Sequence, residues 1–176
     1  GSSAVTKASF ADNTWQHYAI SILSSPTSTT YKLYVNGELD FTQTPGHSIG
    51  PINRPMIGTI GSLAAESPSN GGVLGRGKLS GSLDEVRFWK EERSEKQVGR
   101  FWYSPVHGGT DLDHTNASLG LYYKFNEGIT GIAQHDKVVL DYSGRIGNGQ
   151  IVNWSSNMRS ATSATDLKSR IPDEHF

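Results

Sequence analysis

The residues of this chain that are best suited to chemistry are two acidic side chains, Asp84 and Glu127. Each closes an otherwise apolar face of a strand-like stretch, LDEVRFW for the first and LGLYYKFNEG for the second, because side chains alternate across a strand. If the two stretches pair antiparallel with Val86 opposite Phe125, Asp84 meets Glu127. Two adjacent carboxylates repel each other unless a cation or a shared proton neutralises them.

A bound Ca²⁺ ion is one way to neutralise these two charges. Ca²⁺ takes about six to eight oxygen ligands from carboxylates, amides and backbone carbonyls. Nearby residues supply further oxygens, and the predicted metal ligands are Asp84, Glu127, Asn126 and Asp141. The alternative is ordinary structure. In that interpretation Asp84 caps a turn, Asp141 makes an Asx turn with its own backbone, and Glu127 is solvated at a strand end.

Composition excludes several classes of function. The chain has 16 Lys and Arg against 17 Asp and Glu, a net charge of −1, so it lacks the positive field that a general nucleic-acid or anionic-membrane binder needs. The absence of Cys removes disulfides, thiolate metal sites and cysteine nucleophiles. No apolar run approaches the roughly 18 to 20 residues of a membrane span. Neither nucleic acid nor a membrane is therefore an expected partner.

Short β-strands are the elements expected to position these residues, because 20 Gly and 7 Pro punctuate brief alternating segments. The clearest signal is a hairpin that turns at Asn36-Gly37, after which Leu39 and Phe41 resume the apolar face. Two strands before the turn each collect apolar residues on one face: Tyr18, Ile20 and Ile22 on the first, and Tyr31, Leu33 and Val35 on the second. Further strands are predicted at 56–60, 83–89, 119–128 and 150–154.

One short helix and a tail complete the expected organisation. Ser94 and Gln97 have the spacing of a capping box, and the helix that follows ends before Pro105. The predicted fold class is all-β, a two-sheet antiparallel sandwich with this one helix over residues 1–154. Residues 155–176 are too poor in large apolar groups to form a core, so they are expected to be an extended tail or linker.

Three motifs in combination resemble the laminin-G-like (concanavalin A-like lectin/glucanase) jelly roll. They are WQHYAI, KLYVNGELD, and GSLDEVRFW with R-S-x-x-Q-V behind it. The later LGLYYKFNEG and LDYSGRIGNG also resemble the family, but there such stretches normally open the domain. The order here implies either a permuted jelly roll or the end of one module followed by the beginning of the next. Strands that usually lie between QIVNW and WQHYAI are not evident, and a second copy or a partner chain is a source for them.

The phrases YYKFNEG and VLDYSGRIGNG also resemble segments of very large virion proteins of tailed phages. This resemblance implies a location on a virion or another extracellular surface, with the chain as one module of a larger protein.

Glucanases share the fold that the resemblance implies, so catalysis has to be considered. Retaining glycosidases need two carboxylates roughly 5 Å apart on one side of a cleft. Asp84 and Glu85 are consecutive and point to opposite faces, and the E-x-D-x-x-E pattern of those enzymes is absent. The chain is therefore expected to be noncatalytic, with no catalytic residue.

Carbohydrate or receptor binding is the favoured function, because aromatic rings stack on sugar faces while amides and carboxylates bind the hydroxyls. The ligand-binding candidates expected to face outward are Tyr34, Trp89 and Tyr122. The alternative is that these rings are packed as structure. A competing function is a purely structural decoration or assembly domain that binds only neighbouring subunits.

Overall fold

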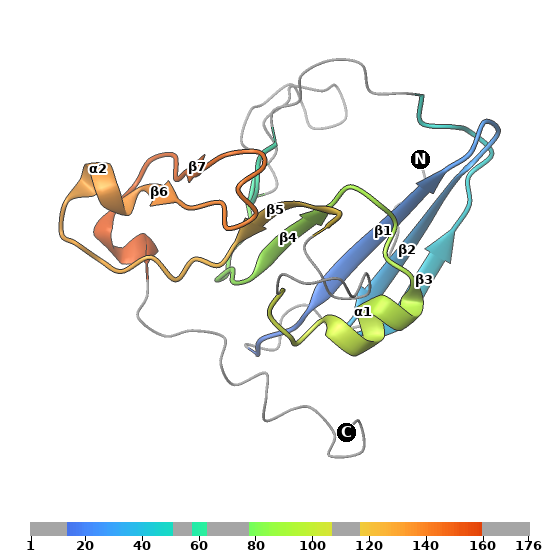
Figure 1. Cartoon of the computed structure of the whole chain (residues 1–176), viewed down its shortest axis with the longest axis horizontal. Coiled ribbons are helices and arrows are strands. Elements are labelled where there is room, and N and C mark those ends of the chain that lie inside the picture. Colours follow the sequence, from blue (N-terminus) through green and yellow to red (C-terminus); the bar gives the residue numbers. More distant parts are fainter. Residues whose placement is uncertain (1–13, 51–57, 63–77, 107–116, 160–176) are drawn as a thin grey trace. The chain divides into compact units, whose positions relative to one another are not determined.

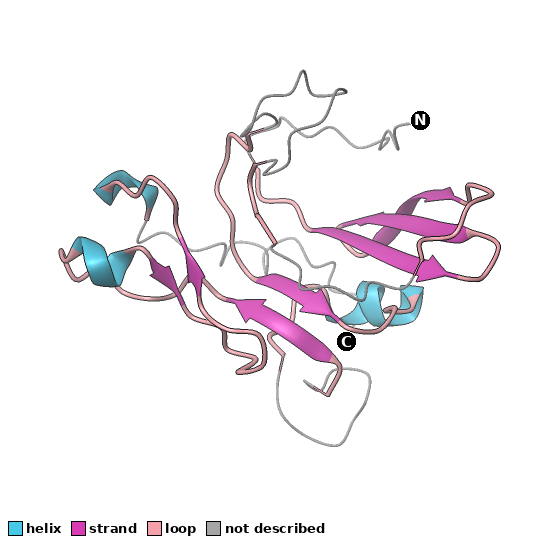
Figure 2. Cartoon of the chain, turned by 90° about the horizontal axis from the view of Figure 1, so that it is seen from above, coloured by secondary structure: helices cyan, strands magenta, loops and turns pink. Residues whose placement is uncertain are grey.

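The computed structural model describes residues 14–50, 58–62, 78–106 and 117–159 (Figure 1). Figure 2 shows that strands outnumber helices in this part of the chain, and all strand pairs are antiparallel. The chain is therefore mostly β with few helices, as the sequence predicted. No helix among the described residues is long and apolar enough to cross a membrane.

The chain divides into two compact units, residues 50–83 and the remainder. In the smaller unit the Leu79 N–H donates a hydrogen bond to the Gly61 carbonyl at 2.7 Å. The strand predicted at 56–60 is not formed at 58–60, and residues 56 and 57 lie outside the described residues.

In the larger unit, β1 (Tyr18–Ser24), β2 (Thr29–Val35) and β3 (Glu38–Gln43) lie side by side in one sheet (Figure 1). The predicted hairpin between β2 and β3 is confirmed. Asn36 and Gly37 both have positive φ, 50° and 84°, which is the conformation that a two-residue turn of this kind requires.

A β-bulge changes the faces of β3. Leu33 lies opposite Phe41, but Tyr34 lies opposite Leu39, so Asp40 is an extra residue on β3. Phe41 therefore shares the face of Leu33, whereas Leu39 pairs with Tyr34, whose side chain belongs to the other face. The prediction that Leu39 and Phe41 continue one apolar face is wrong for this reason.

The predicted helix forms as α1 (Glu95–Phe101), and its predicted capping box is confirmed. The Ser94 hydroxyl accepts from the Gln97 N–H at 3.2 Å, and the Gln97 side-chain oxygen accepts from the Ser94 N–H at 2.9 Å. These bonds satisfy backbone donors of the first turn that have no partner within the helix. Val98 is the buried residue of α1, which packs against β3.

The β2–β3 turn is in close contact with the end of α1. A Cβ added at Gly37 would lie 2.4 Å from the Trp102 side chain, and one added at Gly99 would lie 3.3 Å from the Gly37 carbonyl. The His17 ring lies 5.3 Å from that of Trp102. Burial, together with the positive charge of Arg87, lowers the pKa of His17 from 6.5 to about 4. This packing fixes the C-terminal end of α1 against the β2–β3 turn.

A second sheet pairs the stretch before α1 with the stretch after it. β4 (Val86–Trp89) runs antiparallel to β5 (Leu119–Tyr123). The pairing that the sequence predicted is confirmed, and β4 and β5 lie side by side in Figure 1.

The register of this pair differs from the predicted one by two residues. Val86 lies opposite Tyr123, not Phe125. Glu85 and Phe125 have positive φ, 54° and 55°, a region that non-glycine residues rarely adopt, so regular alternation stops at Val86 and at Tyr123. The acidic residues beyond these two positions are consequently not brought opposite each other.

Between β5 and residue 159 the chain forms four short elements: α2 (Ala133–Asp136), β6 (Val138–Val139), β7 (Gly149–Gln150) and the 3-10 turn η2 (Ser156–Met158). β6 and β7 pair antiparallel. The strand predicted at 150–154 is thus limited to its first residue. Residues 155–159 are packed against the unit through Arg159, although they lie beyond the predicted domain boundary, and residues 160–176 of the predicted tail lie outside the described residues.

Candidate functional site

The two acidic residues that suggested a metal site have separate partners. The Glu127 carboxylate forms an ion pair with Arg159 at 2.9 Å, and the side chains are 13% and 5% exposed. Its other oxygen accepts from the Leu140 N–H at 2.8 Å. Asp84 accepts from the Glu85 N–H at 3.0 Å. The expected pairing of Asp84 with Glu127 is therefore wrong, because the strands end before either residue is reached.

Asp141 is the acceptor for hydrogen bonds that fold its own loop. One carboxylate oxygen accepts from the Tyr122 and Ser143 N–H groups at 3.0 and 2.9 Å. The other accepts from the Ser143 hydroxyl at 2.9 Å and from three further N–H groups, those of Arg145, Ile146 and Gly147. Burial opposes ionisation, but these hydrogen bonds outweigh it and hold the pKa of Asp141 well below its usual range. The Asx-turn interpretation of Asp141 is confirmed.

The four predicted ligands do not fit Ca²⁺. Arg159 already neutralises Glu127, N–H groups occupy the oxygens of Asp141, and Asn126 is exposed at the surface. In the part of the chain that the structure describes, no three His, Asp or Glu side chains gather in a way that would hold a metal ion.

Two of the three predicted sugar-stacking rings are buried. Tyr34 is 0% exposed and Tyr122 is 2% exposed, so the prediction that they face outward is wrong. The Tyr122 hydroxyl donates to Glu85, and the Arg87 guanidinium lies 5.2 Å from the Tyr122 ring. Burial and the bond to Glu85 raise the pKa of Tyr122 to about 12. Both tyrosines are structural residues.

Trp89, at the end of β4, is only partly buried and has a charged neighbour. The guanidinium of Arg93 lies over the Trp89 ring at 4.2 Å from its centroid. Such a cation–π contact orients a long side chain that would otherwise sample many rotamers. Trp89 thus positions Arg93.

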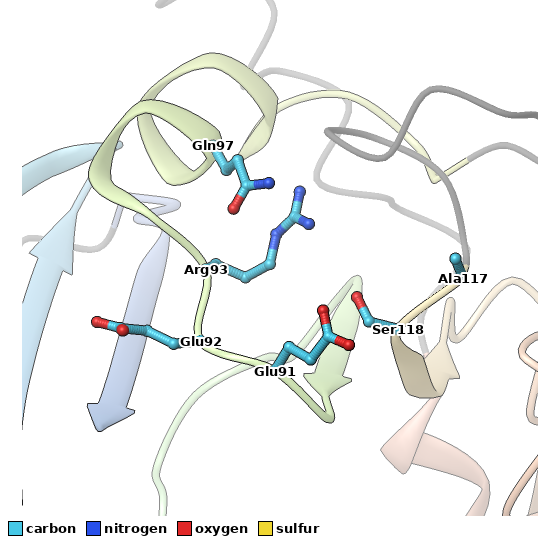
Figure 3. Close-up of a pocket in the computed structure, with 6 residues that line it drawn as sticks. All are labelled: Glu91, Glu92, Arg93, Gln97, Ala117 and Ser118. Carbon is cyan, nitrogen blue, oxygen red and sulfur yellow. The ribbon is translucent and has the colours of Figure 1, made fainter. Parts of the chain in front are cut away.

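A hollow of about 400 Å³ lies next to this pair (Figure 3). Its lining comes from two segments of the chain: Glu91, Glu92, Arg93 and Gln97 between β4 and the first turn of α1, and Ala117 and Ser118 before β5. The β4–β5 pairing brings these segments together, and the Lys90 N–H extends it by donating to the Ser118 carbonyl at 2.8 Å.

The lining side chains differ in direction. Figure 3 shows the Arg93 guanidinium directed toward the Gln97 amide and the Glu91 carboxylate directed toward Ser118. Glu92 points away and contacts Lys32 at 3.6 Å and the Ser21 hydroxyl at 3.1 Å. The hollow thus presents a guanidinium, a carboxylate, an amide and a hydroxyl. Sequence reasoning identified Trp89 but missed the others. For Glu91 and Arg93 the signal was the charged run K-E-E-R that follows the strand.

The fold and the site together define the class of protein. It is an antiparallel, β-rich domain with a polar hollow at the end of a strand. A family model described as the concanavalin A-like lectin/glucanases superfamily, of laminin G type, matches residues 1–99, more than half of the 176 residues. The chain belongs to this superfamily, whose members commonly bind carbohydrates or receptors. Neither the curated proteins nor the solved structures gave a significant match.

Proposed function

We propose that this chain is a noncatalytic recognition module that binds a carbohydrate in the hollow beside Trp89, within a β-sandwich of jelly-roll type. The observation that carries the proposal is the Arg93 guanidinium, held on the Trp89 ring at the edge of a hollow that also contains Glu91, Gln97 and Ser118. Membership of the concanavalin A-like superfamily supports the class of ligand.

The chemistry of the hollow suits a polyhydroxylated ligand. Neighbouring sugar hydroxyls both donate and accept hydrogen bonds, so they need donors and acceptors at close spacing. Arg93 donates, Glu91 accepts, and the Ser118 hydroxyl can do either. The opposite charges of Glu91 and Arg93 favour a neutral sugar over a strongly charged one.

We propose binding without hydrolysis because the carboxylates of Glu91 and Glu92 point in different directions. Glycoside hydrolysis needs two carboxyl groups that flank one scissile bond. In this hollow Glu91 faces Ser118, whereas Glu92 is directed away, toward Lys32. The resemblance to tailed-phage proteins supports a place in a larger virion or surface protein. A purely structural assembly domain is the competing candidate, and it predicts no glycan binding.

Replacing Arg93 with alanine is expected to weaken glycan binding about 10- to 100-fold, since it removes charge-assisted hydrogen bonds from the site. A glycan array identifies the ligand, and calorimetry then compares wild type with Arg93→Ala. Arg100→Ala is the matched control, because Arg100 is exposed in the last turn of α1 and lies outside the hollow lining. Its affinity should equal that of wild type.

EDTA is expected to leave the affinity unchanged, because Glu127 and Asp141, two of the predicted metal ligands, are already engaged within the protein. If the wild-type protein binds no glycan, the structural role is favoured. If Arg93→Ala binds as tightly as wild type, the ligand occupies another surface.

A further inference from the structure

One edge of β5 pairs with β4, and the loop of residues 141–147 bonds to the other edge. The Asp141 carboxylate accepts from the Tyr122 N–H at 3.0 Å. The Ser143 hydroxyl donates to the Gly120 carbonyl at 2.9 Å. The loop therefore satisfies backbone groups of this edge as a further strand would, but mainly through its side chains.

Arg145, in the same loop, extends this contact to the residues just before β5. One terminal nitrogen of its guanidinium donates to the carbonyls of Ala117 and Leu119, at 2.5 and 3.0 Å. These two carbonyls flank Ser118, whose own carbonyl accepts from the Lys90 N–H at 2.8 Å. Residues 117–119 are thus held by Lys90 through one carbonyl and by Arg145 through the two beside it.

The segment that Arg145 holds is one wall of the hollow. Ala117 and Ser118 line it, and the Glu91 carboxylate is directed toward Ser118 (Figure 3). Arg145 itself lies outside the lining. A substitution of Arg145 therefore reaches a ligand in the hollow through the segment that it holds.

We propose that Arg145 is a positioning residue for the hollow, an inference that rests on the proposed glycan-binding function. It keeps the Ser118 hydroxyl on the wall that faces Glu91. A guanidinium suits this task because it is always charged and forms strong hydrogen bonds to carbonyl oxygens. A strand end without such bonds opens more often, and a site that is in its binding conformation for only part of the time binds its ligand more weakly in proportion.

A double-mutant cycle tests this inference, with calorimetry on the glycan that binds the wild type on the array. Arg145→Ala is expected to weaken binding about 3- to 10-fold in the wild-type background. In a Ser118→Ala background the same substitution should weaken binding by less than about 2-fold, because Arg145 acts through Ser118. A general loss of stability would weaken binding alike in the two backgrounds.

Two control variants should bind the glycan as tightly as wild type does. Arg100→Ala makes the same change of charge, outside the hollow lining. Tyr123→Phe removes a different contact of the same loop, the hydrogen bond from the Tyr123 hydroxyl to the Gly147 carbonyl at 3.2 Å.

Hydrogen exchange of the Lys90 N–H measures the position of the segment without a ligand. We expect it to be about 5-fold faster in Arg145→Ala, because the Ser118 carbonyl leaves this N–H more often. Saturating glycan should slow the exchange again, since binding favours the closed segment.

Three outcomes would contradict these expectations. Equal affinity of Arg145→Ala and wild type overturns the inference, and so does an equal loss of affinity in the two backgrounds. A wild type that binds no glycan contradicts the proposed function instead. In that case faster exchange of the Lys90 N–H in Arg145→Ala still supports the positioning of Ser118 by Arg145, and an unchanged exchange rate overturns it.

Discussion

Replacing Asp141 with alanine is expected to lower the free energy of unfolding by about 3 kcal/mol or more. The Asp141 carboxylate accepts hydrogen bonds from the backbone on both sides of the loop, from Tyr122 on β5 and from Ser143 to Gly147. Alanine would leave these N–H groups without their acceptor, and the loop would separate from β5. Urea denaturation measures the change.

Asp141→Asn is the informative control for this prediction. It keeps the shape of the side chain and one acceptor oxygen, but it places an NH₂ group where N–H donors converge. We expect it to destabilise nearly as much as alanine. If Asp141→Ala changes the free energy of unfolding by less than about 1 kcal/mol, the loop is held by other contacts and this account of it is wrong.

The pH dependence of stability should distinguish the contribution of Asp141 from that of His17. The pKa of Asp141 is depressed from 3.8, so its contribution is complete above that pH and is lost as the pH falls further. His17 is also depressed, from 6.5 to about 4, and makes stability fall with decreasing pH between those values. Asp141→Asn should therefore flatten the stability profile only below about pH 4.

Replacing Arg159 with leucine is expected to lower the free energy of unfolding by about 3 kcal/mol, because it leaves the Glu127 carboxylate, which is only 13% exposed, without a counter-charge. The Arg159 side chain is 5% exposed, and besides Glu127 it donates to the carbonyls of Asp136 and Val138, at 2.6 and 2.5 Å. One side chain thus ties the end of the described chain to α2 and β6. Chemical denaturation measures the loss.

Two further variants show whether the cost comes from the unpaired charge. Glu127→Gln combined with Arg159→Leu should recover part of the stability, because the buried charge is gone. Hydrogen exchange in Arg159→Leu should increase around α2, β6 and β7 before it increases in β1 to β3. An Arg159→Leu protein as stable as wild type would instead support the sequence-based boundary at residue 154.

The features that sequence predicted correctly are those set by local chemistry. Asn36-Gly37 tolerates the positive φ of its turn, and Ser94 with Gln97 completes a capping box within four residues. The β4–β5 pairing was also predictable, because both stretches alternate apolar and polar residues. The register of this pair was not predictable, because non-glycine residues rarely adopt positive φ and nothing in the sequence indicates that Glu85 does.

The buried ion pair and the hollow were harder to predict because their residues come from distant segments. Arg159 contacts Glu127, 32 positions earlier in the chain. The hollow joins residues 91–97 to Ser118, and only the β4–β5 pairing shows that they are neighbours. Burial of Tyr34 also depends on tertiary packing, since alternation gives the two faces of a strand but not which of them is covered.

The hollow depends on the pairing of β4 with β5, in which Val86 lies opposite Tyr123. The chain has no Cys, so a pair of introduced cysteines reports the register directly, as cross-strand neighbours lie within disulfide range. Val86→Cys with Tyr123→Cys should form an intramolecular disulfide in mild oxidant, and Val86→Cys with Phe125→Cys should stay reduced. Efficient bridging to position 125 and not to position 123 would contradict the account.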